Sequence, residues 1–313
     1  MDTKIIMSIR TKAILAIIIA SLLWATNVVV AKSLLINFDP LFIALVRSSI
    51  ASLFMIPIVL REKRYPIKLM LKDVVPITSL SAINIALYYS GLHRTTVNAS
   101  AIIYAATPLV VVIISIFTIH EHISLQKIIG IIIGFIGVLS FILLPSIGRG
   151  DVGFGTPIGN GILLIAVVAW ASFIVGSRYL TNIKHYTPLF VTSLSIFSSA
   201  VMLFFVYLMF PHRINITVLF TPQVIVSFLY ISFFVTVVTY VLFQWAIHTL
   251  SSSTASLTNY LQPMFAFYFA WLFLGERITP AFLFGSLLVL LGVFIASANK
   301  LTTIARTLRE GFF

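Results

Sequence analysis

The sequence predicts an all-α integral membrane protein with ten transmembrane helices, arranged as an inverted repeat of five plus five. Of its 313 residues, 60% are hydrophobic and only 9% are charged, whereas soluble domains carry roughly 25% charged residues. The apolar residues gather into ten runs of about 20 residues each, the length that crosses a hydrocarbon core of roughly 30 Å. The chain also repeats itself, as described below. The lipid bilayer is therefore its expected surrounding.

The ten predicted spans follow one another with short polar connections. They cover residues 12–33, 40–60, 73–93, 97–119, 124–144, 158–180, 187–209, 222–247, 251–274 and 279–298. The first run lacks a convincing small-residue cleavage site, so we expect a retained span rather than a signal peptide. No polar stretch exceeds about 15 residues, a length too short for a separate soluble domain.

The second half of the chain repeats the first. Trp24-Ala25-Thr26 returns as Trp170-Ala171-Ser172, and Pro40-Leu41-Phe42 returns as Pro188-Leu189-Phe190. One constant offset of 155 residues relates five further pairs: His93 and His248, Pro108 and Pro263, Glu121 and Glu276, Gly130 and Gly285, and Gly137 and Gly292. Because each copy holds an odd number of spans, the second copy must enter the bilayer upside down, a construction found in secondary transporters.

The basic residues predict the orientation. With the N-terminus inside, fourteen Lys and Arg residues fall on the cytoplasmic side and five outside, which places both termini in the cytoplasm. The predicted units are a cytoplasmic tail (1–11), a first repeat (12–144), an external linker (145–157), a second repeat (158–298) and a cytoplasmic tail (299–313). The net charge of +12 follows from this bias and needs no nucleic-acid partner. The expected location is the plasma or inner membrane.

Several functional classes lack the residues they require. The chain has no cysteine, which excludes thiol catalysis and disulfides. His120-Glu121-His122 lacks the spacing of a zinc protease, in which two histidines lie four residues apart on one helix. No paired acids lie within a span. We therefore expect no enzyme, no metal and no cofactor.

Four features give the chain a resemblance to the drug/metabolite transporter superfamily, specifically to its ten-span members with two EamA-type repeats. They are a tryptophan in the first span of each half, Arg47 in span two, an Ala-Ser step with a later proline in spans four and nine, and a glutamate in the turn closing those spans. The last motif occurs as Phe-Leu-Gly-Glu276-Arg-Ile-Thr and Ile-His-Glu121-His-Ile-Ser. The similarity covers nearly the whole chain. It implies transport of small organic solutes, with spans one, three, four, six, eight and nine around a central cavity.

Polar and aromatic residues inside the spans are the candidate substrate-binding groups, because polar groups in hydrocarbon tend to face a cavity or a partner helix. Thr236, Tyr240 and Gln244 follow one another at intervals of four, which places them on one face of span eight. The other candidates are Trp24, Asn27, Asn84, Tyr88, Tyr104, Trp170, Asn259, Tyr260 and Gln262. Such a lining suits zwitterionic or uncharged solutes. Alternatively, these residues only bond or fill contacts between helices.

Five further residues have predicted roles. Arg47 is interpreted as structural, snorkelling outward or bonding carbonyls, with pairing to a substrate carboxylate as the alternative. Glu121 and Glu276 are interpreted as structural carboxylates beside helix starts. Pro108 and Pro263 are predicted hinges, because each removes one backbone hydrogen bond in mid-span.

The sequence thus favours a transporter of amino acids or similar neutral or zwitterionic solutes, working by alternating access, with export as the expected direction. Exchange of nucleotide sugars or other phosphorylated metabolites, and export of drugs or nucleosides, are the alternatives within transport. A scaffold or channel subunit is the rival outside it. No acidic residue lies deep in a span, so uniport or exchange fits at least as well as proton antiport. Small residues on spans five and ten predict a contact between these two spans, inside one chain or between two, so both a monomer and a homodimer fit.

Overall fold

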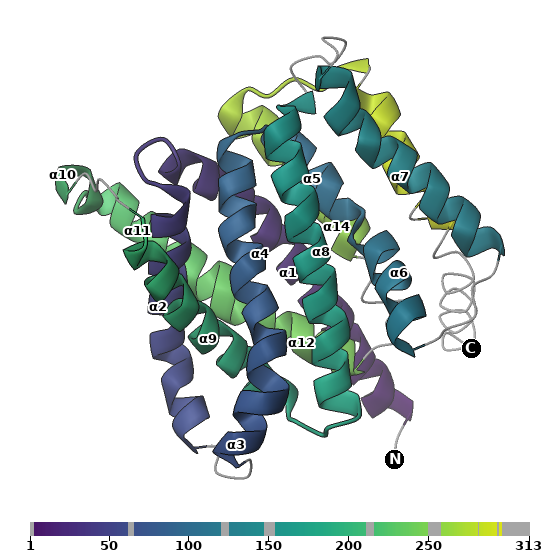
Figure 1. Ribbon diagram of the computed structural model, residues 1–313. Coiled ribbons are helices and arrows are strands. Elements are labelled where there is room, and N and C mark those ends of the chain that lie inside the picture. The colour runs from purple at the N-terminus through teal and green to yellow at the C-terminus, as the bar shows by residue number, and fades with distance from the viewer. Residues whose placement is uncertain are drawn as a thin grey trace.

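The computed structural model describes residues 3–61, 66–119, 125–146, 154–210, 216–249, 258–280, 282–292 and 294–295, and these contain helices and no strand (Figure 1). The elements are α1 (Thr3–Leu34), α2 (Pro40–Arg61), α3 (Ile67–Leu69), η1 (Met70–Val74), α4 (Val75–His93), α5 (Val97–Ala105), α6 (Thr107–Ile119), α7 (Leu125–Ser146), α8 (Pro157–Asn182), α9 (Pro188–Leu208), α10 (Ile216–Leu219), α11 (Pro222–Ser232), η3 (Phe233–Val238), α12 (Thr239–Thr249) and α14 (Thr258–Leu274). A last helical segment covers residues 282–292. The two η elements are π-helical.

Seven helical stretches are long and apolar enough to cross a membrane, and they coincide with predicted spans one to four and six to eight. Three shorter apolar helices, Ile128–Phe141, Gln262–Leu274 and Phe282–Gly292, lie at predicted spans five, nine and ten. The chain is therefore a multi-pass membrane protein. The number ten and the cytoplasmic placement of the termini remain predictions. Helix α1 starts at Thr3, so residues 3–11 of the predicted N-terminal tail are the first part of this helix.

Threonine and proline mark the helix starts. The side chains of Thr96, Thr156 and Thr187 accept the backbone N–H groups of Ala99, Gly159 and Phe190 at the starts of α5, α8 and α9. Helices α8, α9 and α11 also carry proline in their first turn. Proline suits this place because its missing N–H has no partner in a first turn, and the threonine oxygens satisfy free N–H groups.

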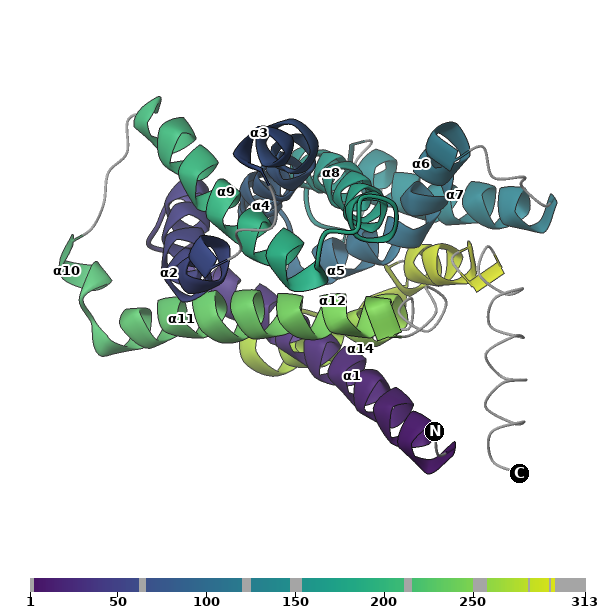
Figure 2. The ribbon, with the colours of Figure 1, turned by 90° about the horizontal axis from the view of Figure 1, so that it is seen from below.

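Each of several helix contacts recurs between the equivalent helices of the other repeat. By position in the repeat, α1 corresponds to α8, α2 to α9, α4 to η3–α12, and α5–α6 to α14. Helix α4 packs on α8, and the equivalent pair α12 and α1 also packs; α4 meets α9, and η3 meets α2. The contacts α2–α9 and α5–α14 join equivalent helices directly. Figures 1 and 2 show α4 and α8 side by side and the α11–α12 segment crossing the bundle obliquely. Both halves thus build one bundle.

Helix α7 and segment 282–292 meet through glycine, as their spacing predicts. A Cβ atom on Gly137 would lie 2.6 Å from the Val289 backbone nitrogen and 3.0 Å from the Gly285 oxygen. A Cβ atom on Gly292 would meet the Gly134 backbone. The two contacts, Gly137 to Val289 and Gly292 to Gly134, are exchanged by the offset of 155. The backbones therefore approach too closely for any side chain at these positions.

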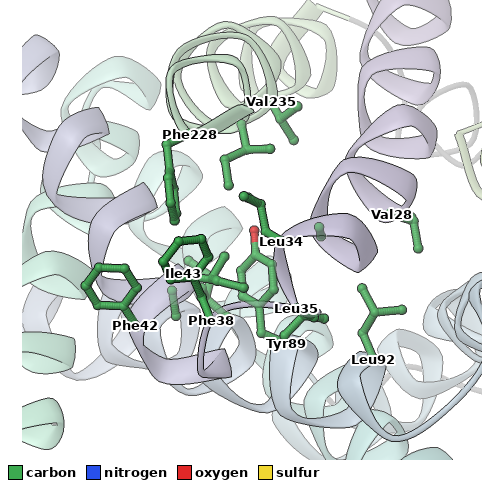
Figure 3. Packing of buried hydrophobic residues seen from close by; sticks show 14 of the residues in the cluster. Val28, Leu34, Leu35, Phe38, Phe42, Ile43, Tyr89, Leu92, Phe228 and Val235 are labelled. Atoms are coloured by element: carbon green, nitrogen blue, oxygen red, sulfur yellow. The ribbon is translucent and has the colours of Figure 1, made fainter. Parts of the chain in front are cut away.

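The largest buried cluster joins α1, α2, α4 and α11 (Figure 3). Phe38, Phe42 and Phe228 pack against one another with ring centroids 5.5 to 6.1 Å apart. Tyr89 is fully buried among these residues, and Figure 3 shows its hydroxyl oxygen directed toward the segment that carries Val235. This cluster therefore surrounds one polar atom that requires a partner.

Candidate functional site

The two repeat-equivalent tryptophans contact each other. Trp24 of α1 and Trp170 of α8 have ring centroids 6.2 Å apart at an interplanar angle of 89°. Tyr240 of α12 contacts both rings, at 6.4 Å from Trp24 and 5.8 Å from Trp170. Phe243 lies 5.0 Å from Trp24. We call Trp24, Trp170, Tyr240 and Phe243 the central aromatic cluster. Because equivalent residues touch, this cluster lies where the two repeats meet.

Polar and aromatic side chains of α1, α4 and α5 form a second group of contacts. The Asn84 side-chain amide donates to the Tyr104 hydroxyl at 2.7 Å and to the Ala166 carbonyl at 2.8 Å. The Tyr104 ring contacts Tyr88 at 5.3 Å, and Asn27 of α1 donates to the Tyr88 hydroxyl at 3.4 Å. Asn84 is buried, whereas Tyr88 and Tyr104 are half-buried. Four of the predicted binding residues, Asn27, Asn84, Tyr88 and Tyr104, are thus connected by these contacts.

The π-helical segment η3 positions Thr236. Its hydroxyl donates to the Ile231 carbonyl five residues earlier, at 2.8 Å, and accepts a 2.6 Å hydrogen bond from Arg47 Nε. The five-residue interval is the one a π-helix provides, and such segments are frequent at functional sites. Thr236 and Tyr240 remain buried despite the wider turn, as does Gln244. Arg47 is also buried and bonds hydroxyls, rather than snorkelling or bonding carbonyls as the sequence had indicated.

The remaining predicted binding residues belong to α14. Gln262 is half-buried. Asn259 and Tyr260 fall within α14, but their side chains lie outside the described part of the chain. These three residues stay predictions, as do the roles of the whole predicted set.

The two predicted hinge prolines have different surroundings. Span four is interrupted at Ala106, between α5 and α6 and two residues before Pro108. Pro108 has no N–H to offer the Tyr104 carbonyl, and the Thr107 hydroxyl donates to that oxygen at 2.6 Å instead. Pro263, in contrast, lies inside the continuous helix α14. The matched sequence positions therefore differ in local structure, and hinge motion at either remains a prediction.

One acid and one lysine hold the connection between α4 and α5. Glu276, in the turn after α14, accepts the backbone N–H groups of Val97 at 2.8 Å and Asn98 at 3.0 Å. Lys32 Nζ donates to the carbonyls of Leu92 at 2.7 Å and Thr95 at 2.6 Å. The helix that Glu276 caps is thus α5, not the one that follows it in the chain. Thr279 accepts the N–H of Phe282 in that following helix. Glu121 lies outside the described residues.

Sequence reasoning did not identify the roles of Tyr89 and Phe243. Phe243 resembles any apolar residue of a span, because 27 phenylalanines are spread along the chain. Lys32 anchors the end of α1 to the α4–α5 connection through its two carbonyl contacts. No group of three or more potential metal ligands occurs among the described residues.

Known proteins that resemble this chain are named as transporters. A model of the EamA-like transporter family matches residues 11–143 and 157–298. An uncharacterized transporter of Bacillus subtilis, YoaV, is 26% identical over 287 residues, covering 91% of this chain and 96% of that protein. An S-adenosylmethionine/S-adenosylhomocysteine transporter of Chlamydia trachomatis is 27% identical over 296 residues, covering 90% and 87%. A solved crystal structure with 17% identity and a TM-score of 0.61 covers 95% of this chain and 99% of its own, and shows likeness of fold alone.

Proposed function

This chain belongs to the EamA-like transporter family, and from that premise we propose that it carries amino acids or similar zwitterionic solutes across the membrane by alternating access, with export as the direction. The contact between Trp24 and Trp170 is the observation that carries the proposal. Inverted-repeat transporters bind their substrates near the bilayer midplane, at the interface of the repeats. The tryptophan contact marks that interface here.

The chemistry around the central aromatic cluster favours a solute with both an apolar and a polar part. Rings of Trp24, Trp170 and Tyr240 offer stacking surfaces, and Asn84 and Tyr104 offer hydrogen bonds. The Asn27 Oδ1 atom is buried and has no partner among the described residues. A buried polar atom without a partner costs free energy, which a bound ligand relieves. The hydrogen-bonding groups named here are amides and a tyrosine hydroxyl, which carry no charge.

A second candidate is a solute that joins an amino acid to a nucleoside. Relatives named as S-adenosylmethionine/S-adenosylhomocysteine transporters are 26–27% identical over most of this chain, and the aromatic rings suit stacking of a base. A phosphorylated solute has less support, because it calls for several cations inside the membrane. Arg47 is the cation that the sequence places well inside a predicted span.

Counterflow in proteoliposomes tests the proposal. Vesicles are preloaded with a mixture of unlabelled amino acids, or with S-adenosylmethionine, and uptake of each labelled compound is followed without a proton gradient. Saturable counterflow of amino acids supports a carrier of that class. Counterflow of S-adenosylmethionine alone selects the second candidate. Absence of both from folded protein overturns the proposed substrate class, and flux that does not saturate indicates a channel.

Two variants connect that result to the site. Replacement of Tyr240 with Phe and of Gln244 with Leu removes two buried polar groups of α12, one of them the hydroxyl of a cluster residue. We expect a loss of substrate selectivity. Tyr268→Phe is the matched control, because Tyr268 is 55% exposed on α14. Unaltered selectivity in the double variant would remove the span-eight residues from the site.

A further inference from the structure

Arg47 places a positive charge in the interior of the bundle. It lies in the first half of α2, and only 5% of its surface is exposed. A guanidinium remains charged in proteins, and a charge buried inside a membrane is costly unless it is paired. The equivalent position of the second repeat is Ser195, which bonds its own helix at Thr192. The charge therefore belongs to one repeat and is not part of the shared scaffold.

The protein partners of Arg47 are neutral. Arg47 Nε donates to the Thr236 hydroxyl at 2.6 Å, and Nη1 donates to the Tyr89 hydroxyl at 2.9 Å. The Tyr89 ring centroid lies 5.8 Å from the central carbon of the guanidinium. These contacts fix the group from α4 on one side and η3 on the other. They leave part of its five N–H donors unused by the described residues, and they do not neutralise its charge.

No carboxylate of the described residues contacts Arg47, and each of the three acids among them is engaged elsewhere. Asp39 accepts the backbone N–H of Leu41 at 2.8 Å. Asp73 pairs with Lys184 at 3.3 Å, and Glu276 caps α5. The other acids of the sequence are Asp2, Glu62, Glu121, Asp151 and Glu310, and all of them fall outside the predicted spans. The described part of the chain thus places no carboxylate against Arg47.

Two residues link the guanidinium to the central aromatic cluster and its neighbours. Thr236, which accepts from Arg47 Nε, lies four residues before Tyr240 in the chain. Tyr89, which accepts from Nη1, has its ring centroid 5.3 Å from that of Tyr88. Tyr240 contacts Trp24 and Trp170, and Tyr88 contacts Tyr104 and Tyr89. A solute held against the cluster would therefore have an unpaired, pre-oriented cation beside it.

We propose that Arg47 recognises the carboxylate of the transported solute, and that Thr236 and Tyr89 are positioning residues that hold the guanidinium for it. Guanidinium and carboxylate form charge-assisted, often bidentate hydrogen bonds. The inference rests on the proposed function and narrows it, because it requires a carboxylate on every good substrate. Amino acids and S-adenosylmethionine carry this group, whereas free nucleosides do not.

Equilibrium binding to the purified protein tests the inference without transport. The standard amino acids and S-adenosylmethionine are titrated against tryptophan fluorescence, each beside its carboxamide, which keeps the side chain and ammonium but removes the negative charge. We expect wild-type protein to bind acids at least about tenfold more tightly than amides, because loss of one member of a buried charge pair is costly. Equal affinity for acid and amide, or no binding of any acid, would overturn the inference.

Variants then assign the preference to Arg47. Arg47→Gln should bring the ratio of acid to amide affinity close to one, and Arg47→Lys should keep part of it. Arg178→Gln, which removes a half-buried cation near the end of α8, should leave the ratio unchanged. An acid preference that persists in folded Arg47→Gln protein would also overturn the inference. If acids bind through Arg47 but none shows counterflow, the proposed function fails and the carboxylate site stands. If acid and amide show equal counterflow, the proposed function stands and the carboxylate site fails.

Discussion

Glu276 and Asn98 are 178 residues apart in the chain, yet Glu276 Oε2 accepts the backbone N–H of Asn98 at 3.0 Å. The other carboxylate oxygen accepts the N–H of Val97 at 2.8 Å. Glu276 follows span nine, and these amides begin span four. An acid of the second repeat thus completes a helix start in the first, where free N–H groups and the helix dipole favour a negative charge.

Replacement of Glu276 with Ala should destabilise the protein. Hydrogen bonds to a charged group contribute about 1.5–3 kcal/mol, and we expect a loss of unfolding free energy within that range. Glu276→Gln should lose less, because its amide oxygen still accepts one N–H. Denaturant unfolding in detergent measures both. The exposed neighbour Arg277 provides the control Arg277→Ala, and equal stability of the two alanine variants would contradict the capping role.

Replacement of Gly137 with Ala should separate α7 from segment 282–292. The added Cβ would lie 2.6 Å from a backbone nitrogen, which cannot move aside as a side chain can. Overpacking of this kind costs about 1–3 kcal/mol. Gly161→Ala is the matched control, because nothing lies within 4 Å of its Cβ position. Thermal unfolding should show a lower midpoint for Gly137→Ala only; two equal midpoints would count against close packing.

Replacement of Thr107 with Val should weaken the structure at the interruption of span four. The variant keeps the side-chain shape but removes the hydroxyl that donates to the Tyr104 carbonyl. Loss of one hydrogen bond of this kind costs about 0.5–1.5 kcal/mol. Thr107→Ser should restore most of the stability because serine carries the same donor. If the serine variant is as unstable as the valine variant, the hydrogen bond is not the cause.

Single introduced cysteines should establish the orientation. The natural chain has no cysteine, so it gives no background labelling. Ile36, 81% exposed, and Ile183, 63% exposed, follow predicted spans one and six. In intact cells a membrane-impermeant maleimide should label Ile36→Cys, and it should label Ile183→Cys only after permeabilisation. The reverse pattern would place the N-terminus outside.

The features that the sequence predicted depend on short stretches of chain. Apolar runs locate the helices, because each run must satisfy its own backbone inside lipid. Predicted spans four and six begin where Thr96 and Thr156 cap the first turn through hydrogen bonds that span three residues. The spacing of Gly137 and Gly292 predicts a close helix contact, because small residues leave the backbone open on one face.

The partners of the site residues depend on how distant helices rotate and cross. The π-helical turn brings Thr236 to Arg47, 189 residues away, and no local pattern specifies that turn. Pro108 adjoins an interruption while Pro263 does not, although the sequence treats the two alike. The sequence by itself thus determined the membrane-spanning helices, the repeat and a set of polar and aromatic residues. The tertiary structure decided which of them meet, because contacts across more than a hundred residues are fixed by packing rather than by local preference.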